Sequence, residues 1–221
     1  MDIRDSFLGA LDPSERGALE QLGHLRQFRT GATLLNEGDP SNFVLLLVEG
    51  HVKVSSLTEH GTEVLLAIRG PGDILGELAA VDGGLRSARV LAIEPVSARV
   101  VSADDFTTFL RDHPRVMGVL LALISGRLRD ADRKRTEFRG YDVPARIALR
   151  LLELGQTHGR QTSSGIALEL RLSQEELAEW VGASREAVAK ALRLLRERGA
   201  IATDRRSLTI LRPELLHRLI D

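Results

Sequence analysis

Cysteine is absent from this chain of 221 residues. Without thiols the protein can form neither disulfide bonds nor the thiolate ligand sets of iron–sulfur clusters and structural zinc sites. Any signal that it senses must therefore act through another chemistry. We expect no metal ion, haem or iron–sulfur cluster.

Long apolar runs are also missing, because no stretch approaches the ~18 residues that a membrane-spanning helix requires. The first residues, Met1 to Asp5, lack the basic and apolar regions of a signal peptide. We expect a cytoplasmic protein without a membrane partner.

Net charge is close to zero, at −1, but its sign differs along the chain. Residues 1–142 carry 17 Lys and Arg against 21 Asp and Glu, whereas residues 143–221 carry 13 against 10. The positive surplus in the second part is modest, so contacts to a polyanion would depend on local clusters of arginine.

Two short helices joined by a tight turn are predicted between residues 172 and 199. Ser173 and Glu176 have the spacing of a capping box, which places the start of the first helix near Gln174. The apolar residues Leu177, Trp180 and Val181 then share one face. Gly182 suits the left-handed geometry that ends a helix.

The second helix starts after Ser184, a good N-cap residue. It has one apolar stripe and one polar face, which is typical of the recognition helix of a helix-turn-helix. The inward stripe contains Val188, Ala191, Leu192 and Leu195, and the outward face contains Arg185, Glu186, Ala189, Lys190 and Arg193.

The outward face suits the major groove of DNA. Arg185 and Lys190 can donate to guanine, Glu186 can accept from cytosine, and the small Ala189 allows close approach. An ordinary amphipathic hairpin with solvated charges is the alternative. The capping box and the glycine turn favour DNA binding.

A basic wing is expected after this helix. Residues 200–210 alternate as two short strands around a polar turn that contains Arg205 and Arg206, which could contact phosphate, although turn arginines are often simply exposed. A short closing helix is expected from Pro213 to Ile220.

The first half of the chain reads as short strands separated by glycines, which predicts an antiparallel β-roll of the jelly-roll type. Flanking helices are expected near residues 13–22 and 103–110. The expected strands cover residues 32–35, 43–48, 51–54, 63–68 and 98–101.

Within this roll, residues 72–79 followed by Arg86, Ser87 and Ala88 resemble the phosphate-binding cassette of cyclic-nucleotide-binding domains. Arg86 can pair with a cyclic phosphate, Ser87 can donate to it, and Glu77 can accept from a ribose hydroxyl. The alternative is a structural ion pair between Glu77 and Arg86. We expect Gly76, Glu77, Leu78, Arg86, Ser87 and Ala88 to contact a ligand.

A helix of about 26 residues is predicted from Pro114 to Arg139, with Gly140 and Pro144 around a hinge. Its apolar stripe calls for a two-fold coiled-coil partner, although part of it could lie on the roll. The stripe contains Met117, Leu120, Leu121, Ile124, Leu128, Ala131 and Phe138. The fold class is α+β, with domains at 1–111 (β-roll), 112–140 (dimerisation helix) and 141–221 (winged helix-turn-helix).

These motifs together make the chain similar to the Crp/Fnr family of bacterial transcription regulators, whose recognition helix opens with the Ser-Arg-Glu found at residues 184–186. The resemblance implies a homodimer that reads a palindromic operator on double-stranded DNA and contacts RNA polymerase. It implies that Ser184 touches phosphate and that Arg185 and Glu186 read a G·C-containing half-site. Ser173, Ala189, Lys190, Arg193 and the wing arginines complete the expected interface.

The resemblance also implies a cyclic nucleotide as effector, with cyclic AMP expected first and cyclic GMP or a cyclic dinucleotide as alternatives. A Thr-Ser pair that contacts the adenine in the best-known member aligns with Ala131 and Asp132, so Asp132 is a candidate purine-reading acceptor. Ligand binding would shift the dimer between two conformations.

Three other interpretations stay open at this point. The pocket could be vestigial, which would leave a regulator that needs no ligand, or the chain could signal through protein partners alone. A cupin-type enzyme also uses a β-roll but needs clustered histidines. The six histidines here are scattered, with no His-x-His pair.

Overall fold

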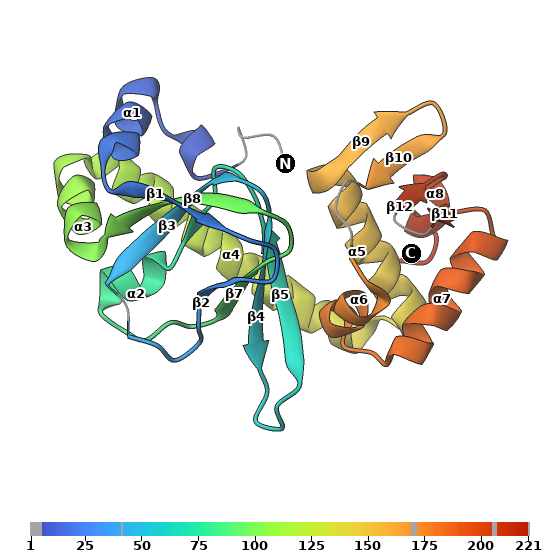
Figure 1. The fold of residues 1–221 in the computed structure, drawn as a ribbon. Helices are drawn as coiled ribbons and strands as arrows, with labels where there is room; N and C mark the ends of the chain where they lie inside the picture. The colour runs from blue at the N-terminus through green and yellow to red at the C-terminus, as the bar shows by residue number, and fades with distance from the viewer. Residues whose placement is uncertain (1–5, 41, 169–171, 205–206, 221) are drawn as a thin grey trace. The chain divides into compact units, whose positions relative to one another are not determined.

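The computed structural model describes residues 6–40, 42–168, 172–204 and 207–220. Its internal contacts separate two compact units, Met1–Arg129 and Asp130–Asp221. Helix α4 (Pro114–Gly140) contains the boundary between them (Figure 1).

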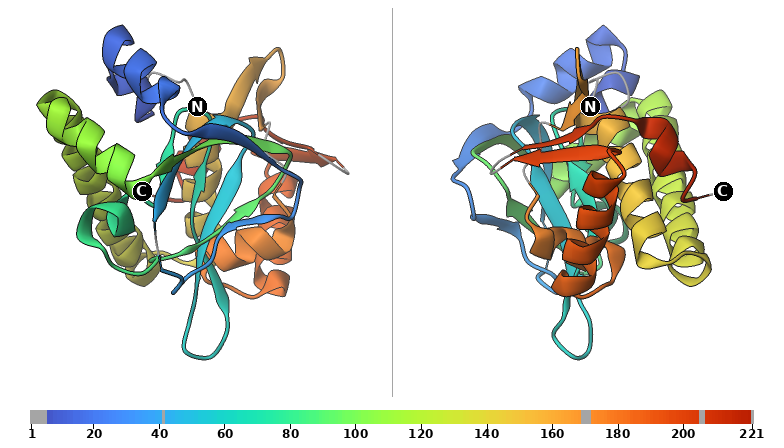
Figure 2. Two further views of the ribbon diagram at one scale, coloured as in Figure 1. Left: turned by 60° about the vertical axis from the view of Figure 1, so that its left-hand side comes forward. Right: turned by 90° about the vertical axis from the view of Figure 1, so that its right-hand side faces the viewer.

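The first unit is built on two antiparallel sheets of four strands, in the orders β1-β8-β3-β6 and β2-β7-β4-β5 (Figure 2). This confirms the predicted β-roll. The expected strands all form, with ends shifted by at most three residues, and the pattern missed β1, β6 and β7. The bounds are β1 His24–Phe28, β2 Thr33–Leu35, β3 Phe43–Glu49, β4 Val52–Leu57, β5 Glu63–Arg69, β6 Ile74–Leu75, β7 Arg89–Ala92 and β8 Val96–Ser102.

Strand β3 explains how the core is arranged. Its side chains alternate between two clusters, because successive residues of a strand point to opposite faces. Val44 and Leu46 belong to an outer cluster that helices cover, while Leu45 and Leu47 belong to the inner cluster between the sheets. All four are buried. A strand covered on both faces reads as a continuous apolar run, which is how it appears in the sequence.

Helices α1 (Pro13–Gln21), α3 (Ala103–Asp112) and the first turns of α4 contribute to the outer cluster. The flanking helices are thereby confirmed, and each has a defined start. Asp12 and Glu15 form a capping box at α1, and Ser102 caps α3. Glu15 also bonds Arg115, whose Nε lies 2.9 Å from Glu15 Oε1, which ties α1 to α4.

The apolar residues of α4 divide into two sets. Val116 and Leu120 are buried in the outer cluster, and Ile124 packs partly against it. Met117 and Leu121 are instead 51% and 65% exposed, and Leu128 is 63% exposed. The single stripe expected from the sequence is therefore a buried face and an exposed one.

The second unit contains the predicted helix-turn-helix and wing. Its four-stranded sheet has the order β11-β12-β10-β9, and α7 leads into the β11–β12 hairpin (Figure 2). The closing helix is shorter than predicted, because α8 ends at His217. The bounds are α5 Val143–His158, β9 Gly159–Thr162, β10 Gly165–Leu168, α6 Gln174–Val181, α7 Arg185–Glu197, β11 Ile201–Asp204, β12 Ser207–Ile210 and α8 Pro213–His217.

The last turns of α4 contact α5 and α6 through charged and aromatic side chains. These are Lys134, Glu137, Phe138, Arg146, Arg150 and Trp180. Arg150 of α5 bonds Glu137 of α4, and both side chains are buried. The Trp180 ring of α6 has Lys134 Nζ and Arg150 Cζ at 5.8 and 5.9 Å from its centroid. A continuous set of charged and aromatic contacts thus connects α4, α5 and α6.

In the described part of the chain, no helix has the length and apolar character needed to cross a membrane. The same residues contain no group of three or more His, Cys, Asp or Glu side chains placed to hold a metal ion.

Candidate ligand cassette and DNA interface

The candidate cassette is a short turn and helix between β6 and β7. Gly76 follows β6 with a φ of 77°, and helix α2 (Glu77–Asp82) ends at Gly83, whose φ is 70°. Both glycines adopt the left-handed conformation that other residues rarely take. A Cβ at Gly76 would also lie 1.9 Å from Nη1 of Arg86. Glycine is therefore required where the arginine crosses the turn.

Arg86 is the buried cation of this cassette, with 4% of its surface exposed. Its Nη1 donates to the carbonyl oxygen of Gly76 at 3.0 Å, and its Nη2 donates to that of Phe43 at 2.7 Å. These bonds use two of its five donors. Burial lowers the pKa of Arg86, while the charges of Glu77 and Asp39 raise it. The guanidinium remains charged, so the site holds a partly satisfied cation.

Glu77 is the buried carboxylate of the cassette, at 3% exposure. Within the described residues it finds its ion-pair partner in Arg127 of α4 rather than in Arg86, with Nη1 and Oε1 2.6 Å apart. Arg127 also donates to the carbonyl oxygen of Ile74 at 2.9 Å. Sequence reasoning missed Arg127. Arg127 stands next to the apolar stripe of the central helix, which was the only sequence feature that could have marked it. It is 50 residues from Glu77, so no local pattern relates the two residues.

The remaining predicted ligand residues differ in position. Leu78 is 40% exposed, Ser87 is exposed, and Ala88 is half-buried just before β7. Asp132 is exposed on α4, and its Oδ1 lies 3.9 Å from Nη1 of Arg135. It belongs to the second compact unit, whereas the cassette belongs to the first. The structure brings Gly76, Glu77 and Arg86 together.

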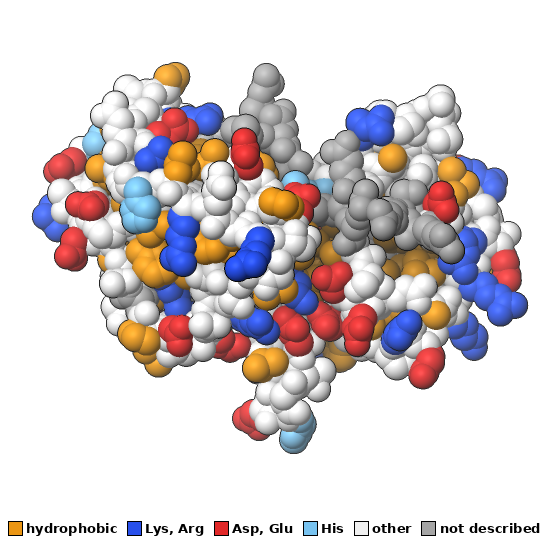
Figure 3. Space-filling view, in the orientation of Figure 1, with side chains coloured by type: hydrophobic (Ala, Val, Ile, Leu, Met, Phe, Trp, Pro, Cys, Tyr) orange, Lys and Arg blue, Asp and Glu red, His pale blue; other side chains and the backbone are white. Residues whose placement is uncertain are grey.

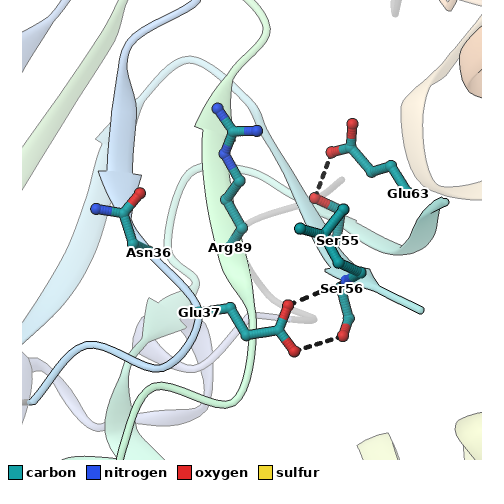
Figure 4. Close-up of a pocket in the computed structure, with 7 residues that line it drawn as sticks. Asn36, Glu37, Ser55, Ser56, Glu63 and Arg89 are labelled. Atoms are coloured by element: carbon teal, nitrogen blue, oxygen red, sulfur yellow. Dashed lines mark hydrogen bonds between the residues drawn. The ribbon is translucent and has the colours of Figure 1, made fainter. Parts of the chain in front are cut away.

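A separate hollow of about 240 Å³ lies on the sheet that contains β4 and β5 (Figure 4). Four of its polar side chains are paired with one another. Glu37 accepts from the Ser56 hydroxyl at 2.6 Å, and Glu63 accepts from the Ser55 hydroxyl at 2.6 Å. This last bond helps to lower the pKa of Glu63. The hollow is lined by Asn36, Glu37, Ser55, Ser56, Leu57, Glu63 and Arg89, none of them a predicted ligand residue.

The helix-turn-helix has the local geometry that its sequence predicts. The Ser173 hydroxyl accepts from the Glu176 amide at 3.1 Å, and Glu176 bonds the Ser173 amide at 2.8 Å. Gly182 has a φ of 60°, and Ser184 caps α7. The capping box, the turn and both helix starts are confirmed.

Helix α7 buries its predicted stripe of Val188, Ala191, Leu192 and Leu195. This packing leaves the opposite face in solvent, and Figure 3 shows basic side chains over α7 at the right-hand edge. Arg185, Glu186, Lys190 and Arg193 are exposed, and Ala189 is half-buried. An exposed helix face of this composition can enter a major groove.

Two contacts lie in the C-terminal part of α7. Arg193 Nε lies 3.1 Å from Oε1 of Glu197, an exposed pair on one helix face. Arg196 donates to the Thr203 hydroxyl at 3.2 Å, which connects α7 to β11. Arg205 and Arg206, predicted at the wing tip, lie outside the described residues.

Comparison with known proteins finds a family match for the part of the chain that contains the cassette and another for the part that contains the helix-turn-helix. The cyclic nucleotide-binding domain family matches residues 25–113, and the Crp-like helix-turn-helix domain family matches residues 145–219. A "CRP-like cAMP-activated global transcriptional regulator" of Mycobacterium tuberculosis is 34% identical over 215 residues, which cover 97% of this chain and 96% of that protein. The "Global nitrogen regulator" of Synechococcus elongatus is 31% identical over 195 residues, 87% of each chain.

Among solved structures, the c-di-GMP responsive global regulator CLP of Xanthomonas campestris superposes with a TM-score of 0.79 and 23% identity, covering 90% of this chain and 99% of that one. This similarity shows the fold. The relatives are regulators rather than enzymes, which confirms the preference for a regulator over a cupin-type enzyme. The chain belongs to the Crp/Fnr family of transcription regulators.

Proposed function

We propose that this protein is a homodimeric transcription regulator that binds a palindromic DNA site and changes its DNA affinity when a cyclic nucleotide occupies the cassette. The observation that carries the proposal is the buried Arg86, held beside a left-handed glycine and close to the buried Glu77. A cyclic phosphate has one negative charge and acceptor oxygens, so it suits a buried arginine with uncommitted donors. Cyclic AMP is the first candidate, because the name of the mycobacterial relative describes that protein as cAMP-activated.

The residues that we assign to the ligand are Gly76, Glu77, Leu78, Arg86, Ser87 and Ala88, with Arg127 added by the structure. Arg127 would orient Glu77, which would accept from the ribose hydroxyl. Asp132 remains the candidate that reads the base. We place the domain boundaries at residues 111/112 and 140/141.

Three exposed residues of α4, Met117, Leu121 and Leu128, supply the dimer seam together with the half-buried Ile124. Met117, Leu121, Ile124 and Leu128 follow one another at intervals of four, three and four, which is the spacing of a coiled coil. Such a seam would set the two recognition helices about 34 Å apart, the distance between successive major grooves on one side of DNA.

On DNA, we assign base reading to Arg185, Glu186 and Lys190, with Ala189 allowing close approach. Phosphate contacts are assigned to Ser173, Ser184, Arg193, Arg205 and Arg206. RNA polymerase is proposed as a further partner, and the cytoplasm as the place of action.

A second candidate function is regulation of DNA without any ligand. It is favoured by one observation: Arg86 and Glu77 already bond protein groups in the described residues. An empty cassette would then be held in place by its own contacts.

Calorimetric titration with cyclic AMP, cyclic GMP and cyclic di-GMP tests the proposal, together with fluorescence measurements of binding to a palindromic DNA. We expect one nucleotide to bind and to raise DNA affinity, and Arg86→Leu to abolish that rise. Arg111→Leu, at an exposed arginine of the same unit, is the matched control. DNA binding without any nucleotide binding would support the second candidate, and equal stimulation of Arg86→Leu and wild type would refute the role of the cassette.

The DNA assignment has its own test in the same assay. Lys190→Ala should weaken binding to the preferred site by about 1–3 kcal/mol and relax the choice of base there. Unchanged affinity and base preference would remove Lys190 from the readout.

A further inference from the structure

Phe43, the first residue of β3, touches the cassette arginine in two ways. Its carbonyl oxygen accepts from Arg86 Nη2 at 2.7 Å, and its ring centroid lies 4.7 Å from Arg86 Cζ. The chain thus supports the guanidinium group through the backbone and through an aromatic face at the same position.

The ring contact has a specific physical effect. The face of an aromatic ring carries partial negative charge and attracts a cation, most strongly where water is excluded. Arg86 is only 4% exposed, and burial lowers its pKa. A stacked ring compensates for that loss of water without using any N–H donor, because the donors of a guanidinium lie in its plane.

The two carbonyl bonds fix Nη1 and Nη2, and the ring covers one face of the group. A group held in this way has its plane and its edge set before a ligand arrives. Preorganisation of this kind raises affinity because less side-chain freedom is lost on binding.

We propose that Phe43 is a positioning residue, whose ring holds Arg86 ready for the anionic group of the ligand. This inference rests on the proposed function, since it assigns the phosphate of a cyclic nucleotide to Arg86. The ring acts only through the arginine, so its removal should weaken the contact with the phosphate.

Phe43→Leu separates the ring from the rest of the residue. Phe43 is half-buried and packs against the inner cluster. A leucine at this position can make the same apolar contacts, and its backbone carbonyl can still accept the bond from Arg86. Phe43→Met is a second variant without a ring, should the leucine variant fail to fold. Thermal unfolding checks both.

The chain offers a matched control. Phe28 belongs to the same inner cluster and also contacts an arginine, because Arg26 Cζ lies 4.9 Å from the centroid of its ring. It lies on β1, outside the cassette. Phe28→Leu should therefore leave nucleotide affinity unchanged.

The experiment is calorimetric titration of the full-length dimer with cyclic AMP, cyclic GMP and cyclic di-GMP. We expect Phe43→Leu to bind the effective nucleotide roughly tenfold more weakly than wild type. Phe43→Trp, which keeps an aromatic face, should restore affinity. In an Arg86→Lys background, which lacks the planar group, Phe43→Leu should have a much smaller effect.

Wild-type affinity in Phe43→Leu would overturn this inference alone. So would a loss that Phe43→Trp does not restore, or a loss of equal size in the Arg86→Lys background, because either would indicate a general packing defect. If wild type binds none of the three nucleotides, the proposed function fails and this inference fails with it.

Discussion

Arg150 of α5 donates a hydrogen bond to the carboxylate of Glu137 on α4, and both side chains are buried. Glu137 also accepts from Arg133 at 2.9 Å, and Arg150 bonds Glu153 at 2.5 Å. The pair is therefore the centre of a charge network that joins α4 and α5 across the two residues between them. Removal of Arg150 would leave the buried carboxylate of Glu137 to the more exposed Arg133.

Arg150→Met should accordingly destabilise the protein by up to about 3–5 kcal/mol, the loss expected when a buried charge is left unpaired, because Arg133 still compensates part of the charge of Glu137. Urea unfolding followed by circular dichroism measures the change. Arg193→Met provides the control, since its pair with Glu197 is exposed and worth about 0.3–0.5 kcal/mol. Equal losses in the two variants would show that the buried pair contributes little.

Gly182→Ala should destabilise the helix-turn-helix for two reasons. A left-handed φ costs a residue with a Cβ about 1–2 kcal/mol, and the new Cβ would lie 2.5 Å from Phe138 Cε2. Gly61→Ala isolates the backbone cost, because its φ is 77° and no described residue lies within 4 Å of the added Cβ. The loss of unfolding free energy should be greater at residue 182. A loss no greater than that of Gly61→Ala would mean that Phe138 moves aside freely.

The contact of Glu15 with Arg115 should make stability depend on pH. The hydrogen bond from Arg115 lowers the pKa of Glu15 below its ordinary value of 4.5, against the opposing effect of burial. A lowered carboxyl pKa contributes stability that is present above pH 4.5 and is lost as the pH falls through the folded-state pKa.

Glu15→Gln should therefore be less stable than wild type at pH 7, and the difference should shrink in acid. Urea unfolding at neutral pH and at about pH 3 measures it. Glu20→Gln, at the exposed pair with Arg16, controls for the loss of one charge. A difference that stays constant with pH would contradict the assignment.

Leu121→Lys should break the proposed dimer, because it places a charge in the exposed seam of α4. Leu121 is 65% exposed in the single chain, so the change should leave the fold intact. Sedimentation velocity should show a dimer for wild type and a monomer for the variant. Leu25→Lys, at a leucine 55% exposed on β1, should remain dimeric. A Leu121→Lys dimer would place the interface elsewhere.

Local sequence signals predicted the helix-turn-helix well. Ser173 and Glu176 are three residues apart, and Gly182 and Ser184 act within their own turns, so their roles depend little on the rest of the fold. The inward stripe of α7 was equally readable, since its spacing is that of a helix. The missed strand β1 has four exposed residues out of five and therefore lacks a clear apolar alternation.

The contacts within the cassette could not be predicted, because they join distant parts of the chain. Arg127 lies 50 residues from Glu77, and Phe43 lies 43 residues from Arg86. The sequence marked the two charged residues of the cassette but not the groups that hold them. Similarly, Glu137 and Arg150 are 13 residues apart and lie on different helices, so no local pattern links them.

The close approach of Gly76 and Arg86 has an evolutionary consequence. Any side chain at position 76 would collide with the guanidinium, in addition to the backbone penalty of a φ of 77°. A smaller side chain at position 86 would cause no such collision while the glycine remains, and its cost would be the loss of the two carbonyl bonds and the ring contact of Arg86. The two sites are therefore epistatic in one direction, and a lineage that abandons its ligand should lose the arginine before the glycine. Among relatives, a retained glycine would then say little about ligand binding, whereas a retained arginine would be the informative trait.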